Sequence, residues 1–327
     1  MTVIAIDAMG GDQGPIPVVA GMARVAKKDP DVTFVVHGNK DELKKRIKKY
    51  KALNDRYEIK PTTKVISMDT KPSTALRNGR DSSMWSTIET LKTGLANVAI
   101  SCGNTGALMA TAMLNLKKAP GVSRPAIACL CPSPNASGFN VLLDAGADIK
   151  ADEKDLLCYC IMGSKFAQNG LQLNKPRIGL LNVGTESHKG RSEIKAAYDL
   201  IAEHEESNGY EFVGFVEGTE IFSDRVDVIV TDGFTGNTAI KSSEGAARVI
   251  RNQLRQAFAH TLFSRIGGFF AYTSLRRFFK RIDPRRANGG VFLGLNGIVI
   301  KSHGGSDAVG IEAAIDLGVK LARSKSF

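Results

Sequence analysis

The sequence predicts a three-layer α/β fold, in which a largely parallel sheet carries helices on both faces. Short apolar runs of strand length alternate with helical patterns along the 327-residue chain, and this alternation requires crossover connections between parallel strands. Many of the 33 glycines fall where the apolar runs end, which indicates tight turns. We find no repeat and no linker-like stretch, so we expect residues 1–327 to form a single α/β domain.

Each expected strand is an apolar run bounded by turn residues, and each expected helix has apolar positions at helical spacing. Asn39 caps a charged helix, and the turn at residues 103–106 opens another. Strands are expected at residues 3–6, 32–36, 65–68, 98–101, 126–131, 140–143, 177–183, 211–216, 226–230 and 298–302. Helices are expected at residues 40–51, 82–96, 152–170, 192–206 and 307–324, from the 103–106 turn to about 118, and from about 236.

The five cysteines form no CxxC pair and have no histidine at metal-ligand spacing. We therefore expect reduced, buried thiols in a cytoplasmic protein, and no metal site. No signal peptide is visible, because Asp7 and Asp12 interrupt the apolar amino-terminal stretch. The uncharged runs at residues 93–116 and 125–143 contain polar and proline turns, so neither is expected to span a membrane.

Four expected strands end in polar, glycine-rich turns. In an open α/β sheet, ligands bind at such strand ends, where backbone N–H groups and helix dipoles favour an anion. Lys189 adds a full positive charge, so we expect an oxyanion site with phosphate as the first candidate. For His303, a capping role and a ligand-facing role remain open. The four turns cover residues 101–106, 182–190, 232–237 and 302–306.

The stretch IDAMGGD at residues 6–12 follows the first expected strand. Gly10 and Gly11 would let the backbone approach a ligand closely, with Asp7 and Asp12 on either side. A tight turn with a helix cap is the alternative. The spacing is not GxGxxG, and no acidic residue stands where a ribose would need one, so a nicotinamide dinucleotide is not favoured.

A basic, aromatic segment occupies residues 251–286 and is expected to form a helical hairpin that Gly267 and Gly268 split at an apolar tip. It holds nine Lys or Arg residues against one acid, which supplies most of the net charge of +11, and six of the fifteen phenylalanines. Basic flanks with an aromatic tip suit an anionic membrane surface. A helix pair that buries its phenylalanines in a dimer is the alternative, and no recognition motif favours nucleic acid. The expected membrane contacts are Ile266, Phe269, Phe270, Arg276 and Arg277.

Taken as an ordered set, these motifs resemble the bacterial phosphate acyltransferases, the acyl-carrier-protein:phosphate transacylases of phospholipid synthesis. The resemblance covers residues 3–322 and implies a homodimer without metal or nucleotide cofactor, with a fold similar to isocitrate and isopropylmalate dehydrogenases. GGVFLG at residues 289–294 replaces the usual GGAPLLG, so the preferred acyl chain length stays open. The other matching motifs are IDAMGGD (6–12), SCGNTGA (101–107), LDAG (143–146), GLLNVG (179–184), GFVEG (214–218) and DGFTGN (232–237).

The resemblance also implies an activity and its partners. A long-chain acyl group would pass from acyl carrier protein to inorganic phosphate, at the inner face of the cell membrane, where an integral glycerol-3-phosphate acyltransferase could accept the product. Lys189 would neutralise phosphate or the oxyanion, and Asn237 would donate a hydrogen bond to the reacting centre. The remaining pocket residues would be Asp7, Gly10, Gly11, Asp12, Ser101, Gly103, Asn104, Thr105, Asp144, Glu186, Asp232, Gly236 and His303.

Two functions from other classes compete with this hypothesis. A short-chain acyl-CoA:phosphate acyltransferase would use the same phosphate site but would not need the basic hairpin. A non-catalytic membrane scaffold would explain residues 251–286 but would leave Lys189 and Asn237 without a role.

Overall fold

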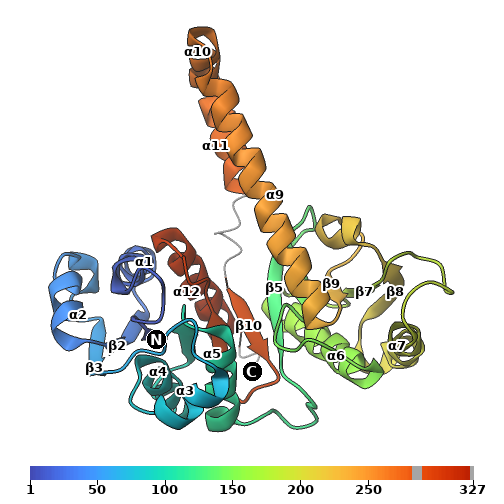
Figure 1. The fold of residues 1–327 in the computed structure, drawn as a ribbon, viewed down its shortest axis with the longest axis horizontal. Helices are drawn as coiled ribbons and strands as arrows, with labels where there is room; N and C mark the ends of the chain where they lie inside the picture. Colours follow the sequence, from blue (N-terminus) through green and yellow to red (C-terminus); the bar gives the residue numbers. More distant parts are fainter. Residues whose placement is uncertain (282–288, 325–327) are drawn as a thin grey trace.

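The computed structural model describes residues 1–281 and 289–324, which build one sheet of eleven strands (Figure 1). The strands are β1 (Thr2–Asp7), β2 (Val32–Gly38), β3 (Tyr57–Pro61), β4 (Val98–Ser101), β5 (Ala126–Pro132), β6 (Phe139–Leu143), β7 (Arg177–Leu181), β8 (Glu211–Val216), β9 (Val228–Val230), β10 (Gly290–Leu293) and β11 (Ile298–Lys301). Their order across the sheet is β3-β2-β1-β4-β11-β10-β5-β6-β9-β7-β8.

The two halves of this sheet run in opposite directions. Most strand pairs are parallel, but β10 is antiparallel to both neighbours and β5 is antiparallel to β6. Lys301, at the end of β11, lies opposite Gly290 in β10, and Leu142, near the end of β6, lies opposite Cys129 in β5. The carboxyl ends of β11 and β6 therefore meet in the middle of the sheet, on either side of β10 and β5.

Helices cover both faces of the sheet, which confirms the three-layer fold. They are α1 (Pro15–Lys28), α2 (Lys40–Ile47), α3 (Pro72–Asn78), α4 (Ser83–Lys92), α5 (Thr105–Leu116), α6 (Glu153–Gly170), α7 (Ser192–Glu203), α8 (Glu205–Asn208), α9 (Gly233–Ala259), α10 (Leu262–Phe270), α11 (Tyr272–Arg281) and α12 (Ala308–Arg323), with 3₁₀ helices η1 (Lys51–Leu53) and η2 (Gly218–Phe222). Adjacent strand residues face opposite sides. Ile100 joins the apolar cluster that α1, α6, α7 and α12 share, whereas Ala99 joins the cluster of α4 and α5.

Several elements differ from the sequence prediction. The prediction of a strand at residues 65–68 is wrong, because the third strand is Tyr57–Pro61 and Val65 is exposed. This strand lies at the sheet edge, where charged residues such as Glu58 and Lys60 are tolerated and hide the apolar pattern. No element was predicted at α1, α3 or β10. α1 begins with two prolines, which a first helical turn accepts because its N–H groups have no helical partner.

α9, α10 and α11 form a hairpin that protrudes from the rest of the molecule (Figure 1). Gly267 and Gly268 do not split it, because both lie within α10. The helices break at two other places, at residues 260–261 before α10 and at residue 271 between α10 and α11. At the first break the Thr261 hydroxyl accepts a hydrogen bond from the Ser264 N–H at 3.0 Å and caps α10. Two of the predicted arginines, at residues 285 and 286, lie outside the described residues. Among the described helices, none has the length and apolar character needed to cross a membrane.

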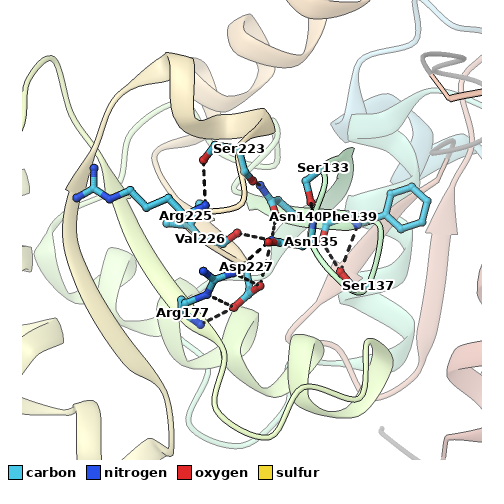
Figure 2. Close-up of polar contacts among 10 residues, drawn as sticks. All are labelled: Ser133, Asn135, Ser137, Phe139, Asn140, Arg177, Ser223, Arg225, Val226 and Asp227. Carbon is cyan, nitrogen blue, oxygen red and sulfur yellow. Dashed lines mark hydrogen bonds and ion pairs between the residues drawn. The ribbon is translucent and has the colours of Figure 1, made fainter. Parts of the chain in front are cut away.

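A buried polar network joins the β5–β6 loop to the amino ends of β7 and β9 (Figure 2). The Arg177 side chain donates to both carboxylate oxygens of Asp227, at 3.0 and 3.1 Å, and to Asn135 Oδ1 at 3.0 Å. Asn135 Nδ2 donates to Asn140 Oδ1 at 2.6 Å, and Asn140 Nδ2 donates to the Ile221 and Ser223 carbonyls, both at 2.9 Å. The network lies at the opposite strand ends from the predicted site, so its role is structural.

Candidate functional site

Two neighbouring strand ends form the first part of the predicted site. Asp7 at the end of β1 lies opposite Ser101 at the end of β4, and the Ser101 hydroxyl donates to Asp7 Oδ2 at 2.7 Å. Asp7 is fully buried. Burial raises the pKa of its carboxyl group, while hydrogen bonds from Ser83 and Ser101 oppose that shift. The buried Asp7 carboxyl group therefore holds the turn after β1 in place through these hydrogen bonds.

Three turns converge around the glycines that follow β1. A Cβ on Gly10 would lie 2.5 Å from Asp7 Oδ2 and 3.0 Å from the Gly103 backbone. A Cβ on Gly11 would lie 3.1 Å from the Gly304 carbonyl oxygen. The Asp12 N–H donates to this same oxygen at 2.9 Å. The paired glycines are thus required for close backbone approach between the turns after β1, β4 and β11.

Asn104 and His303 have local hydrogen bonds at these turns. Asn104 Oδ1 caps α5 by accepting from the Ala107 N–H at 2.9 Å, and Asn104 Nδ2 donates to the Met68 and Thr70 carbonyls. Thr105 is the first residue of that helix. The exposed His303 accepts a hydrogen bond at Nδ1 from the Gly305 N–H at 3.1 Å. Asn104 is thus the N-cap of α5.

The second part of the site lies in the other half of the sheet, after β6. The buried Asp144 carboxylate accepts hydrogen bonds from the N–H groups of Ile127, Gly146, Ala147 and Asp148, at 2.8 to 3.2 Å. Burial raises the pKa of Asp144, and these four donors oppose the shift. The carboxylate therefore shapes the 144–148 turn.

The first turn of α9 packs on that turn. Asp232 caps α9 by accepting from the Thr235 N–H at 2.8 Å, and it forms an ion pair with Arg191. Burial opposes its ionisation, but Thr235 and Arg191 together hold the pKa of Asp232 below its ordinary value. A Cβ on Gly236 would collide with the Asp144 carbonyl oxygen, so glycine is needed there. Asn237 follows, half-buried beside Gly146.

Lys189 lies on the turn after β7. Asn182 Nδ2 joins the two ends of this turn by donating to the Gly184 and Lys189 carbonyls, both at 3.1 Å. The Lys189 ammonium pairs with Glu186 Oε1 at 2.7 Å, which raises the pKa of Lys189 and lowers that of Glu186. In the part of the chain that the structure describes, no hydrogen bond joins Lys189 to Asn237, and the Asn237 side chain has no hydrogen-bond partner.

The two parts flank the central strands. Ala145 and Ala147 of the 144–148 turn pack against the apolar cluster that includes Ala107 of α5 and Ile127 of β5. The charges of Asp144 and Lys301, from opposite halves, both act on the Cys129 thiol in β5. Polar strand exits from both halves thus lie around one central region.

Two cations at these turns were missed by the sequence analysis. Arg191 reaches Asp232, and Lys301 lies at the end of β11 among the turns of the first part. Arg191 stands two residues after Lys189, and Lys301 directly precedes the SHGGS turn at residues 302–306. A basic residue at the border of a predicted ligand turn is the signal that could have identified both.

A cavity of about 950 Å³ lies away from these turns. Its apolar lining comes mainly from α6 and the β10–β11 connection, and includes Leu157, Ile161, Met162, Leu293 and Leu295. No predicted site residue lines it. It is therefore separate from the candidate phosphate site.

The predicted membrane contacts lie on α10 and α11 of the hairpin, which protrudes from the rest of the molecule (Figure 1). Phe269 and Phe270 are 78% and 79% exposed, and Ile266 is 48% exposed. Arg276 and Arg277 on α11 are exposed too. The hairpin thus presents aromatic and basic side chains to the surroundings.

Comparisons with known proteins agree with the fold and with the family resemblance. A sequence profile described as "Fatty acid synthesis protein" matches residues 2–326. A phosphate acyltransferase from Jannaschia sp. (strain CCS1) is 61% identical over 320 residues, which are 98% of this chain and 88% of that protein. A phosphotransacetylase from Streptococcus pyogenes has the same fold, with a TM-score of 0.64 at 18% identity over 98% of this chain and 94% of that one.

A putative 4-hydroxythreonine-4-phosphate dehydrogenase from Salmonella typhimurium aligns with a TM-score of 0.50 at 12% identity, over 98% of this chain and 99% of that one. These two structures show the fold alone. The profile match over almost all residues, together with 61% identity over 88% of the length of a relative, goes further. The chain therefore belongs to the fatty acid synthesis protein family, among relatives named phosphate acyltransferase.

Proposed function

We propose that this protein transfers a long-chain acyl group from acyl carrier protein to inorganic phosphate and so forms acyl phosphate for phospholipid synthesis. The observation that carries the proposal is the 61% identity, over 98% of the chain, to a protein named phosphate acyltransferase. The strand exits around β5 and β10 support the proposal, because their backbone N–H groups and side-chain donors would suit the anion that this reaction needs to bind.

The chemistry needs no activated side-chain nucleophile. A phosphate oxygen attacks the thioester carbonyl carbon, the C–S bond breaks, and the carrier thiolate takes a proton to leave as the free thiol. Phosphate is already anionic at neutral pH. The enzyme must therefore hold phosphate against the thioester and stabilise the charge that develops on the carbonyl oxygen.

Lys189 and Asn237 are proposed for these two tasks. The Lys189–Glu186 pair is exposed, with 42% and 48% of the side chains accessible, and exposed pairs of this kind add little stability. The ammonium can therefore exchange Glu186 for phosphate at small cost. Asn237 lies half-buried as the fifth residue of α9, and the Nδ2 group is available as a donor to the oxyanion.

The test is thiol release from purified long-chain acyl-acyl-carrier protein, measured with and without inorganic phosphate. We expect release that depends on phosphate and yields one acyl phosphate per thiol. A short-chain acyl-CoA:phosphate acyltransferase would instead prefer acetyl-CoA in the same assay. Absence of phosphate-dependent release with either thioester would overturn the proposal and favour a non-catalytic scaffold.

The hairpin is proposed to bind the anionic inner surface of the cell membrane. Its aromatic tip would enter the headgroup region while Arg276 and Arg277 attract the lipid charge. This placement would keep the acyl phosphate near an integral glycerol-3-phosphate acyltransferase.

The positive net charge of +11 also suits docking of an acidic carrier protein. A homodimer is part of the same proposal.

A further inference from the structure

Lys301 is the last residue of β11, and its ammonium group joins two strand exits. Lys301 Nζ donates to the Cys102 carbonyl oxygen at 3.4 Å and to the Ser302 carbonyl oxygen. Cys102 directly follows β4 and Ser302 directly follows β11, and the two strands are parallel neighbours. One half-buried cation therefore ties together the turns that carry Asn104 and His303.

Charged groups from several elements face this ammonium. Asp7 at the end of β1 and Asp12 in the following turn attract it, and Lys241 on α9 repels it. The thiols of Cys102, after β4, and Cys129, in β5, also interact with it. Burial lowers the pKa of Lys301, and the two carboxylates oppose that shift.

An anion that enters these turns lies near two carboxyl groups, that of Asp12 at the turns themselves and that of the buried Asp7 at the end of β1. Asp7 and Asp12 would repel phosphate, because like charges within a few ångströms interact strongly where water is partly excluded. Backbone N–H groups carry only partial charges. Lys301, at the end of β11, carries a full positive charge beside these turns. This charge can offset both carboxylates.

We propose that Lys301 is a positioning residue of the phosphate site, which holds the β4 and β11 exits in register and supplies the positive charge that admits phosphate beside Asp7 and Asp12. This inference rests on the proposed function. A lysine in this place also differs from an arginine, because a lysine can lose its proton at moderately alkaline pH. The site would then lose the positive charge that admits phosphate.

Lys301→Met removes the charge and keeps the length of the side chain. We expect the KM for phosphate to rise about 10–100-fold, the range for losing one charged hydrogen-bond donor, while the KM for acyl-acyl-carrier protein changes little. Lys118→Met is the matched control, since Lys118 also donates to a backbone carbonyl, that of Ser123 at 2.7 Å, but away from the site. It should leave the phosphate KM unchanged.

The pH profile separates a positioning role from a purely structural one. Activity of the unsubstituted protein should fall on the alkaline side as Lys301 loses its proton. Lys241→Met removes the facing like charge, so it should raise the pKa of Lys301 and move this alkaline limb to higher pH. Lys301→Arg, which keeps its charge, should retain activity at a pH where the unsubstituted protein has lost it.

The outcomes are distinguishable from those of the main assay. If the unsubstituted protein shows no phosphate-dependent thiol release, the proposed function fails first. If it is active but Lys301→Met keeps a normal phosphate KM, the role of Lys301 is refuted. Should Lys301→Met not fold, Lys301→Arg decides the question, because an unchanged alkaline limb in that variant contradicts the inference.

Discussion

Individual polar side chains at the site divide into those that build the turns and those left available for substrate. The Asp144 carboxylate is occupied by four backbone N–H groups, and Asp232 by Thr235 and Arg191. Asn237 and Lys189 differ, because the first has no hydrogen-bond partner in the described chain and the second has only an exposed ion pair. Chemistry is therefore expected from these two residues.

Lys189→Ala and Asn237→Ala should each fold normally and lose about 10²–10³ in turnover, the usual effect of removing one preorganised donor to an oxyanion. Thiol release with long-chain acyl-acyl-carrier protein measures the loss, and thermal unfolding checks the fold. Glu186→Gln serves as the control for Lys189, since it frees the ammonium without removing it. Near-normal rates in the two alanine variants would exclude both residues from the mechanism.

His37 predicts an acid sensitivity that is unrelated to catalysis. Its ring is fully buried, with Nδ1 2.9 Å from the Ser86 hydroxyl, and burial together with Lys60 lowers its pKa to about 3. The unfolded chain, with an ordinary pKa near 6.5, binds the proton more readily. The contribution to stability is therefore complete above about pH 6.5 and is lost as the pH falls toward 3, by about 1.4 kcal/mol per pH unit.

Urea unfolding at pH 7.5, 6.0 and 5.0 tests this expectation. The free energy of unfolding should depend less steeply on pH in His37→Phe than in the unsubstituted protein, whatever the stability of the variant at pH 7.5. Equal slopes in the two proteins would show that His37 is not the titrating group.

At the scale of elements, polar contacts decide how strands and helices join. The network around Arg177 and Asp227 ties the β5–β6 loop to β7 and β9 (Figure 2). In the hairpin, the Thr261 cap rather than the glycines determines where α9 gives way to α10. Apolar periodicity alone predicted neither the Arg177–Asp227 network nor the Thr261 cap, because both depend on where single polar side chains point.

Asp227→Ala should lower the free energy of unfolding by about 3 kcal/mol. Asp227 is 6% exposed, and removing it takes both carboxylate contacts away from Arg177, which keeps only its hydrogen bond to Asn135. We take the low end of the range for breaking a buried ion pair because Arg177 is one-third accessible. Denaturant unfolding measures the loss, with Arg225→Ala, which removes a more exposed ion pair with Glu220, as the milder comparison. Equal losses would contradict a dominant role for the buried network.

The hairpin tip gives a second prediction at this scale. Phe269→Asp combined with Phe270→Asp should weaken binding to anionic vesicles, because two exposed aromatic rings no longer enter the headgroup region. Thiol release in solution should survive. Vesicle flotation measures the binding, and light scattering measures the oligomer. If the double variant still binds anionic vesicles but becomes monomeric, the tip forms a dimer contact and not a membrane contact.

The whole molecule brings two oppositely directed half-sheets together. Because β10 and β5 are inserted with reversed directions, strand exits from both halves reach the same central region. The first half contributes the turns after β1, β4 and β11, and the second those after β6, β7 and β9. Neither half alone contains both Lys301 and Asn237, so the proposed site depends on the intact sheet.

The sequence by itself determined the fold class, most helices and strands, and the polar turns at the strand ends, because these depend on local periodicity and on turn residues. It also placed Gly10 and Gly11 in a turn after the first strand, and the structure explains the tight packing of that turn, whereas Asp7 ends β1 and Gly236 lies within α9. The family resemblance likewise depends on ordered local motifs.

Only the tertiary structure decided the strand order, the reversal at β10 and β5, and the contacts of Arg191 and Lys301. The physical reason is that strand pairing and charge placement are set by residues far apart in the chain, such as Lys301 and Cys102. The edge strand Tyr57–Pro61 was missed for a related reason, since its half-exposed position relaxes the apolar pattern on which a local prediction relies.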